Sequence, residues 1–583
     1  MKIKVKPDEV YAEYVKGKEY NTNQNLYDNV QQNRRFYEGD QWHGVNAPNL
    51  TKPVFNIIRR VVTYFIAMLV SDDVAVHLTP FKETPENKTM TSIVAREIDE
   101  VIERAKIKAK NRINIRNACV DGDTCMFINF NPEKDTGQMY KGEIEAEIIE
   151  NTHIIFGNPY SSDVQSQPYI LIIQRMYTNQ VKDMAEDLGL PEDEVSKIVS
   201  DDDTNVYSDS KDYQENLTTV ITKYWKEKKT VQKIRDGQVE MDFVTRKPAE
   251  ETITTVHMTK VTKDVVLKEP VDMEYKLYPV AYMPWETKQN SYHGQSPMTA
   301  LIPNQIYINK IYAMCMVYTT NNAFPRMMYD EAKIKQLTND VTKGIAVPNM
   351  DLVGKVMDAI KAPDFSNQTL QLIDSTINYT RDLMGASDAA LGNIKPDNTS
   401  AIIAVQQASA VPLEIQRLEY YDFVEDIVRI IIDIMSCDYG TRFVKITELE
   451  AEDLELMQPQ MNPNTGMPVM DEMGQPQMEP QTMMQLDFEK LKNMNYSLDV
   501  AIGQSTFWNE TTQIQTMDNL FSKGIITDPL IYLEGIPDKY VPNKAKIVEK
   551  LKEAQQLQEE MAQQQAMMEA AQAAGAPAEG MPA

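Results

Sequence analysis

The stretch from Ser296 to Asn322 constrains the fold more than any other part of this 583-residue chain. Its apolar spacing is helical, and Lys310 is its only charged residue. A helix of this length with so little charge is buried against protein rather than surrounded by water. The only other helix of matching length is predicted near Asp364 to Met384. We therefore expect copies of this helix pair to pack side by side in an oligomer.

The segment between the two helices, Arg326 to Ala362, predicts a small α/β unit. Strands are expected at Pro325 to Tyr329 and at Gly344 to Pro348, around a short helix near Glu331 to Leu337. The unit is therefore inserted between the two helices of a hairpin.

A loop and a long helix are predicted after the hairpin. Glycine, proline and asparagine between Ala386 and Thr399 predict the loop. The helix runs from about Ser400 to Cys437, and Pro412 interrupts it because proline lacks a backbone donor. At 1.5 Å per residue the helix would extend roughly 55 Å.

The N-terminal half changes from helical to β-type spacing. Helices are predicted at about 55–70 and 88–119, and short strands separated by turns are predicted from Thr124 to about Val280. Within this antiparallel β-rich domain, residues 183–215 hold twelve Asp or Glu and two Lys. We interpret that acidic insertion as a mobile surface segment rather than a metal site.

The C-terminal part begins with a low-complexity stretch. Residues Met457 to Met484 are rich in Met, Pro, Gln and Gly and are predicted to be a disordered insertion. Folded character is expected to return from Ser497 to Glu549. A helix rich in Gln, Glu, Ala and Met is predicted from about Pro542 to Ala573, followed by an Ala, Gly and Pro tail.

Charge limits the partners that the chain can hold. There are 59 Lys plus Arg against 86 Asp plus Glu, which gives a net charge of -27. A protein that grips nucleic acid tightly needs cations that displace counterions from the phosphates. If nucleic acid is a partner, we expect the protein to guide it without holding it.

One basic stripe stands out on the predicted helix 88–119. Arg104, Lys108, Arg112 and Arg116 recur every fourth residue and so share one helix face. The stripe is interpreted as a solvated face or a surface that docks on an acidic neighbouring subunit; direct contact with DNA is the alternative.

Export and membrane insertion are not expected. No basic region followed by an apolar run opens the chain. Arg59 and Arg60 interrupt the apolar stretch from Val54 to Val70, which predicts a buried amphipathic helix instead of a membrane span. The four cysteines form no CxxC pair, so free, buried thiols are expected.

Catalytic and cofactor motifs are missing or incomplete. Gly137 to Gly142 has the glycine spacing of a phosphate-binding loop, but Glu143 stands where a lysine must reach the phosphates. The five histidines have no metal-binding spacing and are interpreted as ordinary polar side chains. Ser296 lacks the second half of a nucleophile elbow. No cofactor is expected.

Two acidic positions have a chemical and a structural interpretation. Asp121 and Asp123 could be paired carboxylates, but Gly122 between them favours a turn from helix to strand. Asp433 follows three isoleucines as a magnesium-binding aspartate would, yet the helical pattern around it favours a core helix with one polar position.

Several strings together resemble portal proteins of tailed bacteriophages. They are FYEGDQW at 36–42, the Asp121-Gly122-Asp123-Thr124 turn, and Gly294-Gln295-Ser296 before a helix that bears Gln305 and Asn309. The string from Met384 to Gly392, with Thr399-Ser400 opening the next helix, completes the set. The resemblance covers roughly residues 25–550 and lies in the order of these elements more than in any one of them.

The resemblance implies an α+β portal fold: a mixed α/β wing, a two-helix stem, a small α/β clip, a long kinked helix and a helical C-terminal crown. The implied boundaries are 1–295 for the wing, 296–322 and 364–384 for the stem helices, 323–363 for the clip, and 385–399 for a tunnel loop. The long wing helix would be 400–437, the wing return and crown 438–550, and the final helix and tail 551–583. The insertions at 183–215 and 457–484 match no general portal element.

The resemblance also implies a function. A homo-oligomeric ring, usually of twelve copies, would form at the capsid vertex of a virion assembled in the host cytoplasm. Double-stranded DNA would pass through it during packaging and ejection, without enzymatic activity. The implied partners are the terminase large subunit, a neck adaptor, the major capsid protein and the scaffolding protein, and no membrane.

Candidate contact residues follow from these implied positions. Asn393, Lys395 and Asn398 would face DNA from the tunnel loop, although Lys395 could instead pair with Asp397 or Asp388. The clip candidates for terminase or adaptor contact are Arg326, Lys333, Lys335 and Lys343, whose charge equally suits a soluble surface. Another ring-forming head or neck protein, or an unrecognised phage enzyme, remains an alternative.

Overall fold

A computed structural model describes residues 5–551 except for several segments. The longer ones are 202–215, 240–249, 330–356, 361–366, 384–412, 447–456 and 460–477; the shorter ones are 49, 71–72, 81–84, 136–139, 233, 236–237, 323–325, 481–482, 494–495, 504–506, 525–528 and parts of 535–549. The chain divides into two compact units. One covers Met1–Val70 and Val74–Ala501, and the other covers Ser71–Asp73 and Ile502–Ala583.

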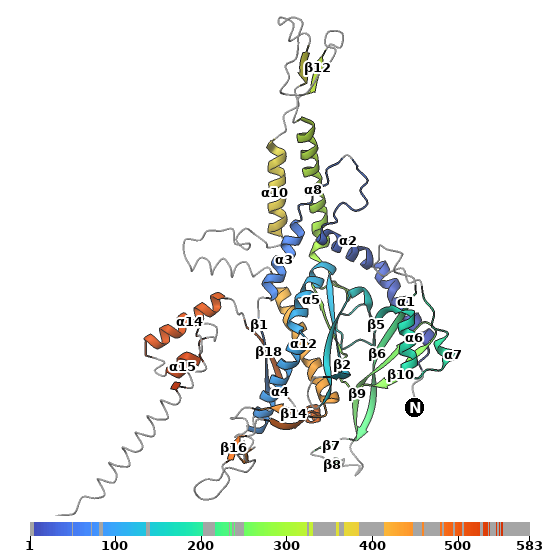
Figure 1. Ribbon diagram of the computed structural model, residues 1–583, viewed down its shortest axis with the longest axis vertical. Helices are drawn as coiled ribbons and strands as arrows, with labels where there is room; N and C mark the ends of the chain where they lie inside the picture. Colours follow the sequence, from blue (N-terminus) through green and yellow to red (C-terminus); the bar gives the residue numbers. More distant parts are fainter. Residues whose placement is uncertain are drawn as a thin grey trace, which may run out of the picture. The chain divides into compact units, whose positions relative to one another are not determined.

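The larger unit is α+β and is built on two antiparallel sheets (Figure 1). The five-stranded sheet has the order β10-β9-β6-β5-β4, and the three-stranded sheet has the order β11-β2-β3. Their bounds are β2 Asp123–Asp135, β3 Lys141–Ile149, β4 Ile154–Phe156, β5 Tyr169–Tyr177, β6 Leu217–Gln232, β9 Glu250–Val261, β10 Val266–Asp272 and β11 Val280–Pro284. The predicted antiparallel β-rich segment is confirmed.

The first three helices are α1 Pro7–Asn23, α2 Leu26–Glu38 and α3 Ile57–Val70. Val10 and Tyr14 of α1 pack on the five-stranded sheet in one apolar cluster with Ile155, Leu171, Ile173, Ile221 and Val261. The predicted amphipathic helix is confirmed as α3, which buries Ile58, Val61, Val62, Tyr64, Phe65 and Leu69. Among the described residues, no helix has both the length and the apolarity to span a bilayer.

The single helix predicted at 88–119 is wrong, because the structure has two helices there. They are α4 Pro85–Arg104 and α5 Ile107–Asp121, separated by Lys106, whose φ of 54° is left-handed. Such a conformation breaks the run of i to i−4 hydrogen bonds. Neither glycine nor proline marks the break, so the helical pattern of the sequence continues through it.

The acidic insertion is folded over its first part, contrary to the prediction. It contains the end of α6 Thr178–Asp187 and all of α7 Glu192–Val195. Ala185, Val195 and Ile198 of the insertion, together with Val181 just before it, are buried against Val220, Val265 and Leu267. These few apolar side chains anchor the segment despite its charge. The rest of the insertion, 202–215, lies outside the described residues.

The predicted helical hairpin is present as α8 Pro297–Asn322 and α10 Asn367–Leu383. Between them, β12 Arg326–Tyr329 is the predicted first strand, but its antiparallel partner is β13 Met357–Ile360. The sequence pattern does not identify β13. The strand predicted at Gly344 to Pro348 and the helix predicted near Glu331 to Leu337 lie outside the described residues.

The described part of the long helix is α12 Glu414–Asp438, and the predicted portion from 400 to 412 lies outside the described residues. It is followed by β14 Thr441–Lys445, which pairs with β17 Met483–Asp487, and by the short helix η5 Phe488–Asn493. Short strands β15 Met457–Pro459 and β16 Met478–Pro480 pair with each other. The low-complexity stretch is therefore structured at both ends, and its middle lies outside the described residues.

Four further strands form two pairs: β7 Ile234–Arg235 pairs with β8 Gln238–Val239, and β1 Asp73–Pro80 pairs with β18 Tyr496–Gly503. The smaller unit contains α14 Phe507–Ser522 and α15 Pro529–Glu534. Phe521 and Tyr532 join these two helices with ring centroids 4.7 Å apart. The predicted helix from Pro542 to Ala573 lies mostly outside the described residues.

Candidate functional site at the root of the helical hairpin

The two hairpin helices lie side by side, as Figure 1 shows. The Asn304 amide of α8 donates a hydrogen bond of 3.3 Å to the Thr380 hydroxyl of α10. Both helices nevertheless leave apolar side chains in water: Ile306, Tyr307 and Met314 on α8, and Leu372 and Tyr379 on α10. Met314 is 59% exposed and Tyr379 is 69% exposed. The hairpin therefore retains apolar faces that the described part of the chain does not cover.

A close backbone contact fixes the start of α8. Gly122, at the end of α5, has a φ of 106° and lies against Gly294, in the loop before α8. A Cβ on Gly122 would come within 2.9 Å of the Gly294 carbonyl oxygen, and a Cβ on Gly294 within 2.3 Å of the Gly122 carbonyl oxygen. Two facing positions without side chains allow the two backbones to meet.

Ser296 caps α8 and ties it to α5. Its hydroxyl donates to the Cys119 carbonyl oxygen at 2.6 Å and accepts from the Met298 backbone N–H at 3.1 Å. The second bond satisfies one of the free donors at the helix start. Asn33 of α2 adds bonds to the Val120 carbonyl and to the Thr299 hydroxyl. Helices α2, α5 and α8 are thus joined at one point.

A buried polar chain lies beside this junction. The Asp123 carboxylate, at the start of β2, contacts Nδ1 of His293 at 2.8 Å and accepts from the Tyr282 hydroxyl at 2.6 Å. Nε2 of His293 contacts the Asn21 side-chain oxygen of α1 at 3.0 Å. Burial and the Asp123 charge raise the pKa of Tyr282 well above its ordinary value, so its hydroxyl stays protonated and donates.

Arg34 of α2 neutralises the other carboxylate of the turn. Its guanidinium forms two bonds to Asp121, at 2.9 and 2.7 Å, and a third to Glu150 at 3.1 Å. The two-pronged geometry matches a carboxylate. Burial raises the pKa of Asp121, while the bond to Arg34 opposes that rise. Asp121 and Asp123 therefore have separate partners, and the turn interpretation is the better one.

Side-chain amides fasten α8 to the entry of α3. The Asn309 amide donates to Gln41 Oε1 at 2.6 Å, and the Gln305 amide donates to the Phe55 carbonyl oxygen at 2.6 Å. Gln305 Oε1 in turn accepts from the Ile57 backbone N–H at 3.1 Å. Gln41 belongs to the FYEGDQW string. The strings at 36–42, 121–124 and 294–309 thus meet at the root of the hairpin.

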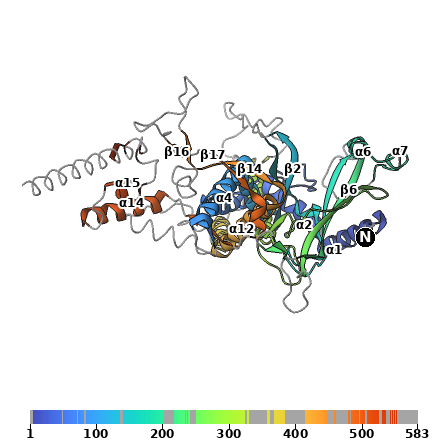
Figure 2. The same cartoon turned by 90° about the horizontal axis from the view of Figure 1, so that it is seen from below.

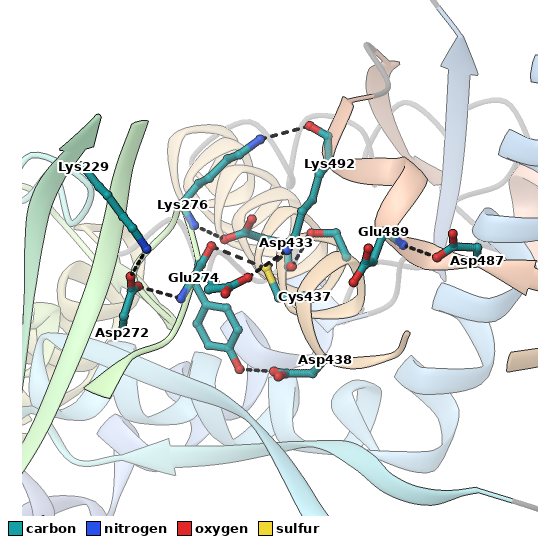
Figure 3. Close-up of polar contacts among 12 residues, drawn as sticks. Lys229, Asp272, Glu274, Lys276, Asp433, Cys437, Asp438, Asp487, Glu489 and Lys492 are labelled. Atoms are coloured by element: carbon teal, nitrogen blue, oxygen red, sulfur yellow. Dashed lines mark hydrogen bonds and ion pairs between the residues drawn. The ribbon is translucent and has the colours of Figure 1, made fainter. Parts of the chain in front are cut away.

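A second polar cluster holds the C-terminal end of α12 (Figure 3). The Asp433 carboxylate accepts backbone N–H bonds from Lys276 at 2.8 Å and from Leu277 at 2.9 Å, in the loop between β10 and β11. Lys492 of η5 donates to Glu274 at 3.1 Å, and Asp438 accepts from the Tyr275 hydroxyl. The three isoleucines before Asp433 are buried, so the predicted core helix is confirmed.

Few of the predicted contact residues can be placed. Arg326 begins β12, while Lys333, Lys335, Lys343, Asn393, Lys395 and Asn398 lie outside the described residues. Arg104 ends α4 and contacts Glu100, so it is not on the helix that carries the rest of the predicted stripe. Lys108, Arg112 and Arg116 are exposed together on α5.

The sequence reasoning missed the polar residues at the hairpin root. His293 is buried, with its ring bonded on both sides, and is not an ordinary polar side chain. Its position directly before Gly294-Gln295-Ser296 was the available signal. Arg34 and Asn21 lie in helical patterns, and no feature of the sequence marks them as parts of this cluster. Among the described residues, no three His, Cys, Asp or Glu side chains gather in a way that could hold a metal ion.

The comparison with protein families decides the identity of the chain. A family model described as Phage P22-like portal protein matches residues 17–582. The chain belongs to this portal protein family. No curated protein matches it.

As a phage portal protein, the chain functions at the capsid vertex through which DNA is packaged and ejected. The family is structural and non-enzymatic, and membership implies a ring oligomer in the phage head together with capsid and DNA. In the portal protein, three of the strings that carried the resemblance, at 36–42, 121–124 and 294–309, anchor α8. The strings at 384–392 and 399–400 lie outside the described residues. The anchoring therefore serves the helical hairpin.

We predict that Gly122→Ala destabilises the portal protein more than Gly39→Ala. Both glycines have a φ near 105°, which costs a side chain about 1–2 kcal/mol, but a Cβ on Gly39 would have open space within 4 Å. The difference between the thermal midpoints of the two variants measures the close contact with Gly294. Equal midpoints would contradict this account of the junction.

We also predict that Asp433→Ala loosens the loop between β10 and β11. The substitution leaves two backbone N–H groups without their acceptor, at a cost of about 1–3 kcal/mol. Faster hydrogen exchange at the Lys276 and Leu277 amides is the expected result. Asp422→Ala, on the exposed face of the same helix, should leave these amides unchanged.

Proposed function

We propose that copies of this chain close into a ring whose channel wall is lined by the α8–α10 hairpins, which would form the stem. The supporting observation is the exposed apolar surface of both helices, which a neighbouring hairpin would bury. The firm root of α8 would hold each hairpin at a fixed position in the ring. Residues 1–295 would then form the wing, 323–363 the clip and 438–550 the wing return and crown.

The proposed ring has twelve copies, as is usual in portals. Its clip would meet the terminase large subunit during packaging and a neck adaptor afterwards. The major capsid and scaffolding proteins would surround the wing during assembly in the host cytoplasm. We propose Arg326, Lys333, Lys335 and Lys343 as the clip cations that contact terminase or adaptor.

The acidic composition supports a channel that does not grip DNA. Twelve copies at -27 each surround the duplex with negative charge, which screening confines to roughly 8–10 Å at ordinary salt. Phosphates would find no deep electrostatic well, so the duplex could slide. Against this background, Asn393, Lys395 and Asn398 in the proposed tunnel loop, 385–399, would touch the phosphates only transiently.

Negative-stain images of the purified protein test the ring directly. Particles with a central hole are the expected result, and monomers at high concentration would contradict the proposal. Incubation with plasmid DNA and a divalent metal, and separately with ATP, tests the alternative that the chain is an enzyme. Cleavage of the DNA or hydrolysis of ATP would favour that alternative.

We predict that Tyr379→Lys prevents ring formation. The change places a charge on the apolar face of α10 that the neighbouring hairpin would bury, where an unpaired charge is costly. Tyr160→Lys is the matched control, because both tyrosines are 69% exposed but Tyr160 lies in the loop between β4 and β5. Size-exclusion chromatography with light scattering distinguishes rings from monomers. If both variants formed rings equally well, the stem would not be part of the interface between copies.

We predict that Lys395→Ala lowers the packaging rate or the retention of packaged DNA without affecting ring formation. The substitution removes the only cation between Asp382 and Glu414, and with it the proposed phosphate contact. Packaging into purified proheads measures both quantities. Unchanged packaging and retention would mean that Lys395 pairs within the protein instead.

A further inference from the structure

Helix α5 carries a cationic face that is exposed in the protomer. Lys108, Arg112 and Arg116 are spaced four residues apart and point away from the core, with Ile113 beside them at 44% exposed. Arg116 bonds to the neighbouring Asn117 side chain and to no carboxylate among the described residues. The face therefore combines three cations with one exposed apolar side chain.

Helix α12 carries an acidic face of similar construction. Glu419, Asp422 and Asp426 lie along it, together with Ile415 at 69% and Leu418 at 54% exposed. The neighbouring Glu425 is paired with Arg429. Burial, together with the charges of Glu425, Asp422 and Asp163, raises the pKa of Asp426 to about 6. In the isolated protomer these carboxylates repel one another.

The two faces lie on neighbouring helices that meet through buried residues. The Asn111 amide of α5 donates to the Tyr420 hydroxyl of α12 at 3.4 Å, and both side chains are buried. Asn111 lies on the same side of α5 as the buried residues Ile107, Asn114, Ile115 and Ala118. Tyr420 lies on the same side of α12 as the buried residues Phe423, Val424, Ile427 and Ile431. Neither charged face takes part in this contact.

Figures 1 and 2 both show α12 next to α4, the helix that leads into α5, and α4 and α12 contact each other. The cationic and acidic faces lie on two different helices of the protomer, α5 and α12.

We propose that the cationic face of α5 on one copy docks against the acidic face of α12 on the next copy. The contact is head-to-tail, as a closed ring requires, because each copy contributes a different face to each of its two neighbours. The inference rests on the proposed ring and adds a second contact to the one made by the hairpins.

The opposite charges of the two faces favour a second copy of the chain as the docking partner. The cations of α5 would meet the carboxylates of α12, and Ile113 would pack near Ile415 and Leu418. Docking would also relieve the repulsion around Asp426, because an opposite charge favours its ionised form. Interfaces of this kind weaken with salt when their charges lie at a solvated rim.

Charge reversal tests the contact with the full-length chain. The variant Arg112→Glu/Arg116→Glu and the variant Asp422→Lys/Asp426→Lys each place like charges across the proposed contact. Each variant alone should lose the ring fraction seen for the unmodified chain. An equimolar mixture should regain rings of alternating copies, because every contact in such a ring joins opposite charges. A chain with all four substitutions should assemble alone.

Lys16→Glu/Lys490→Glu is the control with the same change in net charge as the arginine variant, and it should assemble normally because both lysines are exposed on other elements. Circular dichroism of each variant separates loss of assembly from loss of folding. Rings formed by both doubly reversed variants, or no recovery in the mixture and in the fourfold variant, would overturn this interface. Unmodified chains that stay monomeric would contradict the proposed function itself.

Discussion

The arrangement of the hairpin depends on the backbone contact between Gly122 and Gly294. This contact brings the end of α5 against the start of α8, and the surrounding polar bonds hold it there: Ser296 to the Cys119 carbonyl, His293 to Asp123, and Asn309 to Gln41. Each of these groups is buried, so each bond must be kept to avoid an unsatisfied polar atom. The start of α8 is therefore fixed by buried hydrogen bonds as well as by apolar packing.

Much of the fold could be predicted from the sequence. The helical apolar spacing of 296–322 identified α8, and the β-type spacing after Thr124 identified the antiparallel sheets. Helix α3 was predicted to be amphipathic because two arginines interrupt its apolar stretch, and the structure exposes both of them. In each case the periodicity of apolar residues was long enough to specify one kind of element.

The errors have identifiable causes. The break at Lys106 depends on one left-handed residue, which lysine does not signal. Acidic composition masked the four apolar side chains that anchor α6 and α7. At the hairpin root, the motifs were recognised but their contacts were not, because Asn21, Asp123 and His293 are far apart in sequence and meet only in the folded chain. A single sequence does not show which distant residues come together in the folded chain.

The contact of Asp433 with the loop between β10 and β11 has a consequence for how the chain can vary. The carboxylate recognises two backbone N–H groups and not the side chains of Lys276 and Leu277. Most other side chains at these two positions, proline excepted, would leave the contact with Asp433 in place, although a change at Lys276 would lose its bond to the Lys492 carbonyl oxygen. Asp433 has no such latitude, since few other side chains offer an acceptor at that distance. Mutational tolerance should be unequal across this contact, wide on the loop and narrow on the helix.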